Sequence, residues 1–155
     1  MSERADPQPA DPHPLDPHPV DRGFTHVALP VSDLDASLAF YRDYADMVPV
    51  HAREGHDGVR VAWISDRTRP FVVVLLERPV DHVLGGWSHL GVGLRSRAAV
   101  DEVLARAEAE GRAVLGPVDS GPPVGYWGFI QDPDGHNLEV AHGQEVGFTV
   151  EHPEA

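Results

Sequence analysis

The sequence predicts an α+β fold made of two tandem copies of one βαβββ unit. A strand-like apolar segment, a capped helix and three further strand-like segments follow one another twice along the chain. A His and a Glu also recur at nearly equal separation, His26 to Glu77 (51 residues) and His89 to Glu139 (50 residues). With 155 residues, 41% of them hydrophobic, the chain is long enough to bury the core of such a fold.

The first copy spans about residues 23–79. Its helix is expected to begin at a cap formed by Ser32 or Asp33 and to run through Asp43, with an apolar face that includes Leu34 and Leu38. The expected strands of this copy cover 24–31, 48–52, 59–65 and 71–78. A Pro- and Gly-containing linker over 79–86 then joins the two copies.

The second copy spans about residues 87–144. Its helix is expected to begin at a cap formed by Ser96 and to end at Gly111. The expected strands cover 88–94, 112–115, 125–131 and 137–142. Asp132-Pro133-Asp134-Gly135 is a strong hairpin-turn signal between the last two strands.

The two ends of the chain differ from the repeated units. Residues 1–22 contain three Asp-Pro-x-Pro-x units. Alternate prolines prevent both a helix and a sheet ladder, so this arm is expected to be extended and solvated. Residues 145–155 are expected to form a C-terminal tail.

The composition excludes several classes of function. The net charge is −13 and the chain has no Lys/Arg cluster, so neither nucleic acid nor an anionic membrane is an expected partner. There is no Cys, which excludes disulfides, thiolate metal ligands and a Cys nucleophile. No secretory signal or apolar run of membrane-spanning length is present in this sequence, and a cytoplasmic location is expected.

The repeated His and Glu residues are candidate metal ligands. Strand alternation places Glu77 and Glu139 beside mainly apolar neighbours, where an ionised carboxylate costs several kcal/mol unless a cation or hydrogen bonds compensate it. If a pseudo-two-fold axis relates the copies, His26, Glu77, His89 and Glu139 can converge on one divalent ion. Their nitrogen and oxygen donors suit Ni, Co, Zn, Mn or Fe(II).

Two alternatives remain open for these four residues. His26, His89 and Glu139 alone would form a set of two His and one carboxylate, with Glu77 as a supporting group or a base. Taken singly, His26 could be a hydrogen-bonded histidine of a sheet and Glu77 the solvated end of a strand.

Further side chains are candidates for contact with a substrate. Trp63, Tyr126 and Trp127 could stack on it, although aromatic residues in strands also serve as core. Arg60 could hold an anionic group or form a surface ion pair.

Two segments resemble the vicinal oxygen chelate superfamily, which includes glyoxalase I, bleomycin- and fosfomycin-resistance proteins and extradiol dioxygenases. Residues 25–42 (THVALPVSDLDASLAFYR) resemble its opening module, and residues 128–140 (GFIQDPDGHNLEV) resemble its closing hairpin. The resemblance implies two curved mixed sheets that form a metal-holding cleft, and homodimers in which modules pair across the two chains. It also implies that His26, Glu77, His89 and Glu139 occupy the ligand positions of glyoxalase I.

The resemblance implies a function as well. The group binds a small molecule to its metal through two neighbouring oxygens, and the cation stabilises the developing enediolate charge. A glyoxalase-like lyase or isomerase with Glu139 or Glu77 as the base is therefore expected. The alternatives are an extradiol-type dioxygenase and a non-catalytic drug- or metabolite-binding resistance protein. The glutathione-contacting residues of glyoxalase I are not identifiable in the chain, so a thiol cosubstrate is left open.

Overall fold

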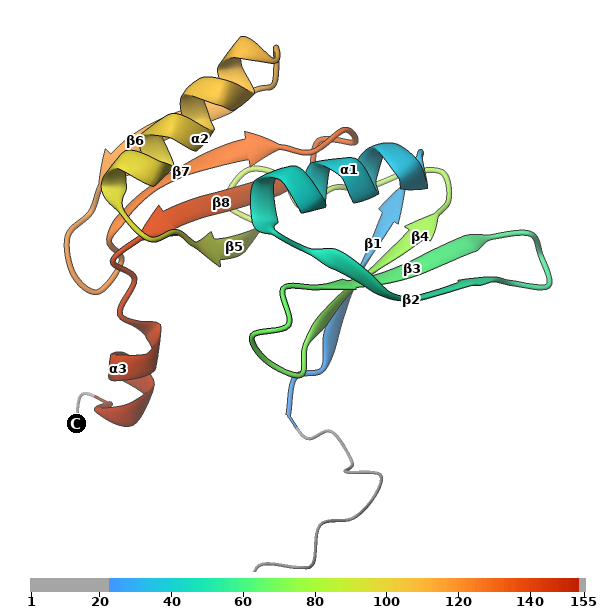
Figure 1. Cartoon of the computed structure of the whole chain (residues 1–155), viewed down its shortest axis with the longest axis horizontal. Helices are drawn as coiled ribbons and strands as arrows, with labels where there is room; N and C mark the ends of the chain where they lie inside the picture. Colours follow the sequence, from blue (N-terminus) through green and yellow to red (C-terminus); the bar gives the residue numbers. More distant parts are fainter. Residues whose placement is uncertain (1–22, 154–155) are drawn as a thin grey trace, which may run out of the picture.

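The structure is a computed structural model that describes residues 23–153; the proline-rich arm over 1–22 lies outside the described residues. Two βαβββ modules follow one another, and a short C-terminal helix ends the described chain (Figure 1). The first module comprises β1 (His26–Val31), α1 (Leu34–Ala45), β2 (Val48–Glu54), β3 (Arg60–Ser65) and β4 (Val72–Glu77). The second comprises β5 (His89–Gly93), α2 (Arg97–Ala109), β6 (Val114–Asp119), β7 (Tyr126–Gln131) and β8 (Asn137–His142), and α3 (Val146–Glu151) follows it.

Each module contributes one mixed four-stranded sheet. The strand orders are β1-β4-β3-β2 and β5-β8-β7-β6, so the two sheets have the same topology. The first strand of each module pairs in parallel with the last, and the remaining pairs are antiparallel. The α+β class and the duplicated βαβββ unit predicted from the sequence are confirmed.

Both helices begin at the predicted caps. The side chain of Asp33 accepts a hydrogen bond from the Ala36 N–H (3.0 Å), and Ser96 Oγ accepts one from the Ala99 N–H (3.1 Å). The strand β6 begins two residues later than expected. The Arg112 N–H still donates to the Ala107 carbonyl at the end of α2, which keeps residue 112 out of the strand.

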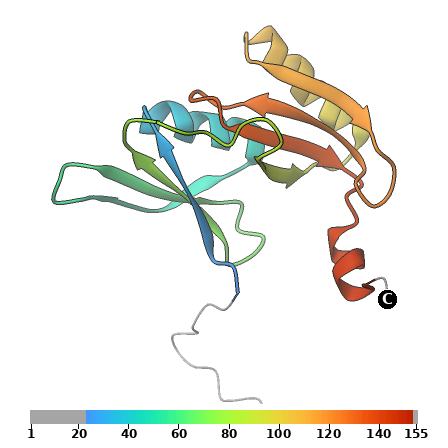
Figure 2. The same cartoon turned by 180° about the vertical axis from the view of Figure 1, so that it is seen from behind.

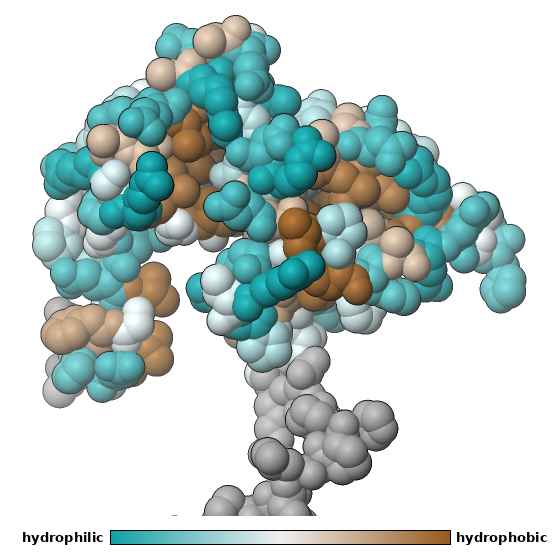
Figure 3. All heavy atoms as spheres, viewed as in Figure 1, coloured by the Kyte–Doolittle hydropathy of each residue, from teal (hydrophilic) through white to brown (hydrophobic). Residues whose placement is uncertain are grey.

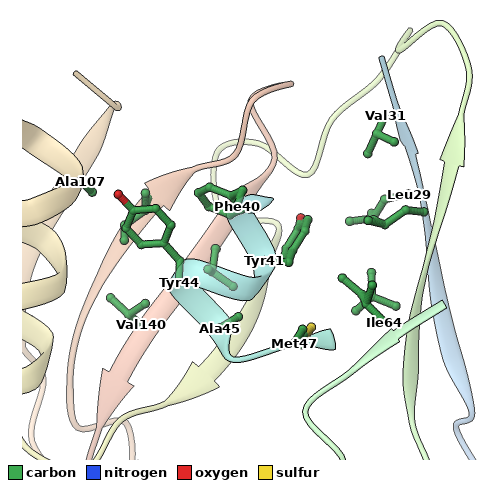
Figure 4. Packing of buried hydrophobic residues seen from close by; sticks show 14 of the residues in the cluster. Leu29, Val31, Phe40, Tyr41, Tyr44, Ala45, Met47, Ile64, Ala107 and Val140 are labelled. Atoms are coloured by element: carbon green, nitrogen blue, oxygen red, sulfur yellow. The ribbon is translucent and has the colours of Figure 1, made fainter. Parts of the chain in front are cut away.

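One hydrophobic core joins the two modules. Alternate residues of β1 and of β8 are buried and face this core, Leu29 and Val31 in the first strand and Leu138 and Val140 in the second. The helix α1 lies between the sheet of its own module and the second module, as Figure 4 shows for the rings of its aromatic residues. The face of each sheet that is turned away from this core is left open.

Polar contacts fix the two modules to each other. The buried ring of His136 donates from Nε2 to the Pro30 carbonyl (2.9 Å), while its Nδ1 accepts from the Leu84 N–H (3.0 Å) of the linker. The Tyr41 hydroxyl donates to Asp132 Oδ2 across the same seam (3.1 Å). The orientation of the two open sheet faces is therefore set by contacts within one chain.

The helix α3 was not predicted and stands away from both sheets (Figures 1 and 2). Its apolar side chains Val146, Phe148 and Val150 are exposed, and Figure 3 shows the hydrophobic surface that results. Among residues 23–153, no helix is both long and apolar enough to cross a membrane.

Candidate metal and substrate site

His89 and Glu139 meet on the open face of the second sheet. In the parallel pairing of β5 with β8, Gly91 lies opposite Glu139 and His89 lies opposite Asn137, so both candidate ligands point to the same face. His89 Nε2 is 3.5 Å from Glu139 Oε2. The structure thus brings together the two ligands expected from the second copy.

The hydrogen bonds of His89 suit a cation between the two side chains. His89 Nδ1 is 2.7 Å from the Trp87 carbonyl oxygen, which can only accept, so Nδ1 carries a proton. In the neutral ring, Nε2 then presents its lone pair to a carboxylate oxygen that also carries lone pairs. A metal ion is a partner that both groups can share, and a backbone acceptor on the second nitrogen is typical of metal-binding His.

The carboxylate of Glu139 is held in place and is nearly buried, since only 8% of its side chain is exposed. Gln144 Nε2 donates to Glu139 Oε1 at 2.5 Å, which leaves Oε2 directed toward His89. The facing residue Gly91 has no side chain, and a Cβ there would lie 3.8 Å from Oε1. A side chain at position 91 would therefore contact the carboxylate, and glycine leaves that space free.

Aromatic rings surround this pair. Phe129 lies 4.9 Å from the His89 ring and 5.0 Å from Trp127, and Trp87 contacts both Trp127 and Phe129 edge-on at 6.2 Å. The predicted substrate-binding residue Trp127 thus lies on the same face as Glu139, and its Nε1 donates to Ser120 Oγ (3.0 Å). Trp87 is 78% exposed, so this aromatic face is available to another molecule.

His26 lies on the open face of the other sheet. Its ring is exposed, and its Nδ1 is 3.0 Å from Thr25 Oγ1. It lines a groove of about 610 Å³ that also contains Trp63, a second predicted substrate-binding residue. Within the described part of one chain, no three His, Asp or Glu side chains are grouped closely enough to hold a metal.

Glu77 does not lie with His26, and within one chain the structure does not bring the four predicted ligands together. In the β1–β4 pairing His26 lies opposite Val72, whereas Glu77 lies opposite Val31, on the helix-covered face. By register, the counterpart of Glu139 is Val74. His26 and its cross-strand neighbour Val72 are 46 residues apart in the sequence, whereas His89 and its neighbour Asn137 are 48 residues apart. The similar His-to-Glu separations therefore do not place Glu77 and Glu139 at equivalent positions of their sheets.

The role of Glu77 in the structure is to hold the start of α1. Its Oε1 accepts from the Leu34 N–H at 3.1 Å and lies 3.3 Å from Arg60 Nη1. A carboxylate at a helix N-terminus is stabilised by the backbone N–H groups and by the helix dipole. This contact accounts for a partly buried Glu without a metal.

Arg60 and Tyr126 also face away from the open sheet surfaces, so their predicted contact with a substrate is not supported. Arg60 is bound to Asp35 at 2.8 Å, the surface ion pair that the sequence left as an alternative. The Tyr126 hydroxyl donates to Asp101 (2.6 Å), and this hydrogen bond raises the pKa of Tyr126. The guanidinium of Arg97 lies over its ring.

The family model described as the Glyoxalase/Bleomycin resistance protein/Dioxygenase superfamily matches residues 23–140. The chain belongs to this superfamily. A superfamily relative from Pseudomonas aeruginosa, the uncharacterised protein PA2024, is 39% identical over 127 residues, which are 79% of this chain and 90% of that protein.

Solved structures agree on the superfamily fold. Glyoxalase I of Leishmania major, described as trypanothione-dependent, superposes with a TM-score of 0.66 at 19% identity, over 84% of this chain and 94% of that one. TnmS3, an antibiotic-binding protein of Streptomyces sp. CB03234, gives 0.60 at 23% identity, over 81% and 98%. A FosX fosfomycin-resistance protein of Listeria monocytogenes, solved with Mn(II) and a dihydroxypropylphosphonic acid, gives 0.62 at 19% identity, over 79% and 93%.

Several residues of the site were missed from the sequence. Gln144 lies five residues after Glu139 and beyond the end of its strand, so strand alternation gives no signal for their hydrogen bond. Trp87 lies in the turn two residues before His89, and this spacing was a usable signal that its ring lies near His89. Arg53 and Arg69 line the groove beside His26, from an edge strand and a loop.

Proposed function

We propose that this protein is a metal-dependent enzyme that acts on a small molecule bound through two neighbouring oxygens. The proposed ligands are His26, His89 and Glu139, a set of two imidazoles and one carboxylate that leaves coordination positions for a substrate. The observation that carries the proposal is the contact between His89 and Glu139. Both are oriented by neutral partners, and His89 Nε2 lies 3.5 Å from Glu139 Oε2.

The site is proposed to form between two copies of the chain. His26 lies on the open face of the first sheet, and His89 and Glu139 lie on the open face of the second. Contacts within the shared core hold these faces apart in one chain. In a symmetric dimer, the first module of each copy covers the second module of the other and completes two identical sites.

The residues of the chain then have separate tasks. A divalent ion held by them, one of Ni, Co, Zn, Mn and Fe(II), supplies Lewis-acid stabilisation of negative charge on the substrate oxygens. The Trp87 carbonyl orients His89, and Gln144 orients Glu139. Trp127 and Phe129 exclude water beside them, which strengthens these electrostatic contacts.

Glu139 is the proposed base for a glyoxalase-like lyase or isomerase reaction. Its Oε2 would have to leave the cation to accept a proton from a carbon next to a carbonyl, and Oε1 stays held by Gln144. Glu77 is not proposed for this task, since it lies on the far face of its sheet and binds the start of α1.

Metal content tests this proposal. The full chain, purified without added metal, is expected to carry close to one equivalent, measured by plasma mass spectrometry. We expect His89→Ala and Glu139→Gln to bind metal at least about tenfold more weakly, because each loses a ligand or its charge. Glu77→Gln is a matched control for Glu139→Gln and is expected to keep its metal, as is His82→Ala in the exposed linker.

Two results would contradict the proposal. One is less than about a tenth of an equivalent of metal in the unmodified chain, with no binding on titration. That result would favour a non-catalytic binding protein, and TnmS3 is an antibiotic-binding protein of the same fold. The other is loss of metal in Glu77→Gln equal to the loss in Glu139→Gln, which would restore the four-ligand set.

A further inference from the structure

The His26 groove contains two arginines that are not paired with a carboxylate of the described chain. Within residues 23–153, Arg53 and Arg69 form no ion pair with a carboxylate. Five other arginines do: Arg42, Arg60, Arg78, Arg97 and Arg112. Arg67, Arg95 and Arg106 of the described chain also form no such ion pair, so Arg53 and Arg69 are distinguished by their shared position in one groove.

The surface between these arginines is apolar. Alternate residues of β4, Val72, Val74 and Leu76, form its floor, with Trp63 of β3 beside them. In the antiparallel pairing, Trp63 lies opposite both Val74 and His51, so its ring stands over the middle of the sheet. A flat apolar group bound in the groove would pack on the β4 side chains and would contact the Trp63 indole at one side.

The two charges stand at different ends of this floor. Arg69 is in the β3–β4 loop, next to the start of β4 and therefore at the end of the groove where His26 lies opposite Val72. Arg53 lies on β2 opposite Val61, at the far edge and the other end of the sheet. An elongated ligand can thus lie on apolar side chains while a guanidinium contacts its anionic end.

We propose that this groove binds small apolar anions, molecules with a flat hydrophobic body and a carboxylate or another single acidic group. Arg69 at one end of the groove or Arg53 at the other supplies charge-assisted hydrogen bonds to the acidic group, and Trp63 with the β4 side chains binds the body. These anions are the proposed substrate class of the metal site, and any reaction of a bound anion rests on the proposed function. Binding itself requires only the groove.

Fluorescent probes that differ in one charged group test this inference. The probes are 8-anilinonaphthalene-1-sulfonate and the uncharged N-phenyl-1-naphthylamine, titrated into the full chain in the presence of EDTA. We expect the double variant Arg53→Gln/Arg69→Gln to bind the sulfonate at least about tenfold more weakly and the uncharged probe within about twofold of the unmodified chain. Trp63→Leu is expected to weaken both probes.

Arg95→Gln is the control, since Arg95 is also without a carboxylate partner in the described chain but does not line the groove. It is expected to change neither probe. Equal affinity of the unmodified chain and the double variant for the sulfonate would overturn the inference. So would an unchanged affinity of Trp63→Leu for both probes, which would place the probes elsewhere. Because EDTA removes metal, these results do not depend on whether the proposed metal site exists.

Discussion

Asp132 is a buried carboxylate at the seam between the modules. Its Oδ1 accepts hydrogen bonds from the N–H groups of Asp134 (2.9 Å) and His136 (2.8 Å), and its Oδ2 accepts the Tyr41 hydroxyl. Burial nevertheless dominates and raises the pKa of Asp132 above its ordinary value. The folded protein therefore holds a proton on this group more tightly than the unfolded chain does.

This shift predicts a pH dependence of stability. Below about pH 4 the carboxyl is protonated in both states, and as pH rises through the raised pKa the folded state bears the cost of a buried charge. The unfolding free energy of the unmodified chain should therefore fall with rising pH relative to that of Asp132→Asn. Urea unfolding of both proteins between pH 4 and 7 measures the difference. A difference that stays constant over this range would contradict the assignment.

Only some of the candidate ligands could be placed correctly from the sequence alone. His89 and Glu139 could be placed together because both lie in short strands whose alternation is readable. The position of Glu77 could not be found in this way, since its face depends on how β4 aligns with β1 across some 40 intervening residues. Arg53 and Arg69 carry no local pattern at all, and only the assembled groove reveals them.

At the scale of elements, α2 packs on β7 at a glycine. A Cβ added to Gly128 would lie 2.6 Å from Leu104 Cδ1 and 2.8 Å from the Leu115 carbonyl oxygen. Contacts this short force the helix or the edge strand β6 to move. Only glycine allows α2 to approach the sheet so closely.

Gly128→Ala is therefore expected to destabilise the protein by about 1–3 kcal/mol. Gly93→Ala is the matched control on β5, where a Cβ would have no neighbour within 4 Å. It should change the unfolding free energy by less than about 0.5 kcal/mol. Urea unfolding measures both, and equal stability of the two variants would contradict the close packing of α2 on β7.

The helices α1 and α2 and seven of the eight strands lie within about two residues of their predicted ranges, because apolar alternation and polar caps are local signals. The edge strand β6 was predicted to end at Leu115, whereas it continues through Pro117, which an edge strand tolerates. The helix α3 was missed because it is only six residues long and has no side-chain cap. The four-residue spacing of Val146 and Val150 was its one helical signal.

The whole molecule joins two similar modules by their helix-covered faces and leaves both sheet faces open. This arrangement follows from α1, whose aromatic residues pack on its own sheet and on the second module at once (Figure 4). One open face carries His26 above an apolar groove, and the other carries His89 and Glu139 among aromatic rings. Within the described residues neither face groups three candidate ligands, and together the two faces carry His26, His89 and Glu139, the set proposed to bind a metal.

The central claim is that a second copy of the chain completes the metal site. Chains carrying His26→Ala and His89→Ala are to be co-expressed with different affinity tags, and the heterodimer isolated through both tags. In a symmetric dimer with sites shared between chains, this heterodimer has one intact site and one site that lacks both histidines.

The amount of metal bound per dimer, measured by plasma mass spectrometry, tests whether the site is shared between chains. We expect about two equivalents for the unmodified dimer, about one for the heterodimer and less than about a tenth for each variant homodimer. A heterodimer that binds no more metal than the variant homodimers would contradict a site built from His26 of one chain and His89 and Glu139 of the other.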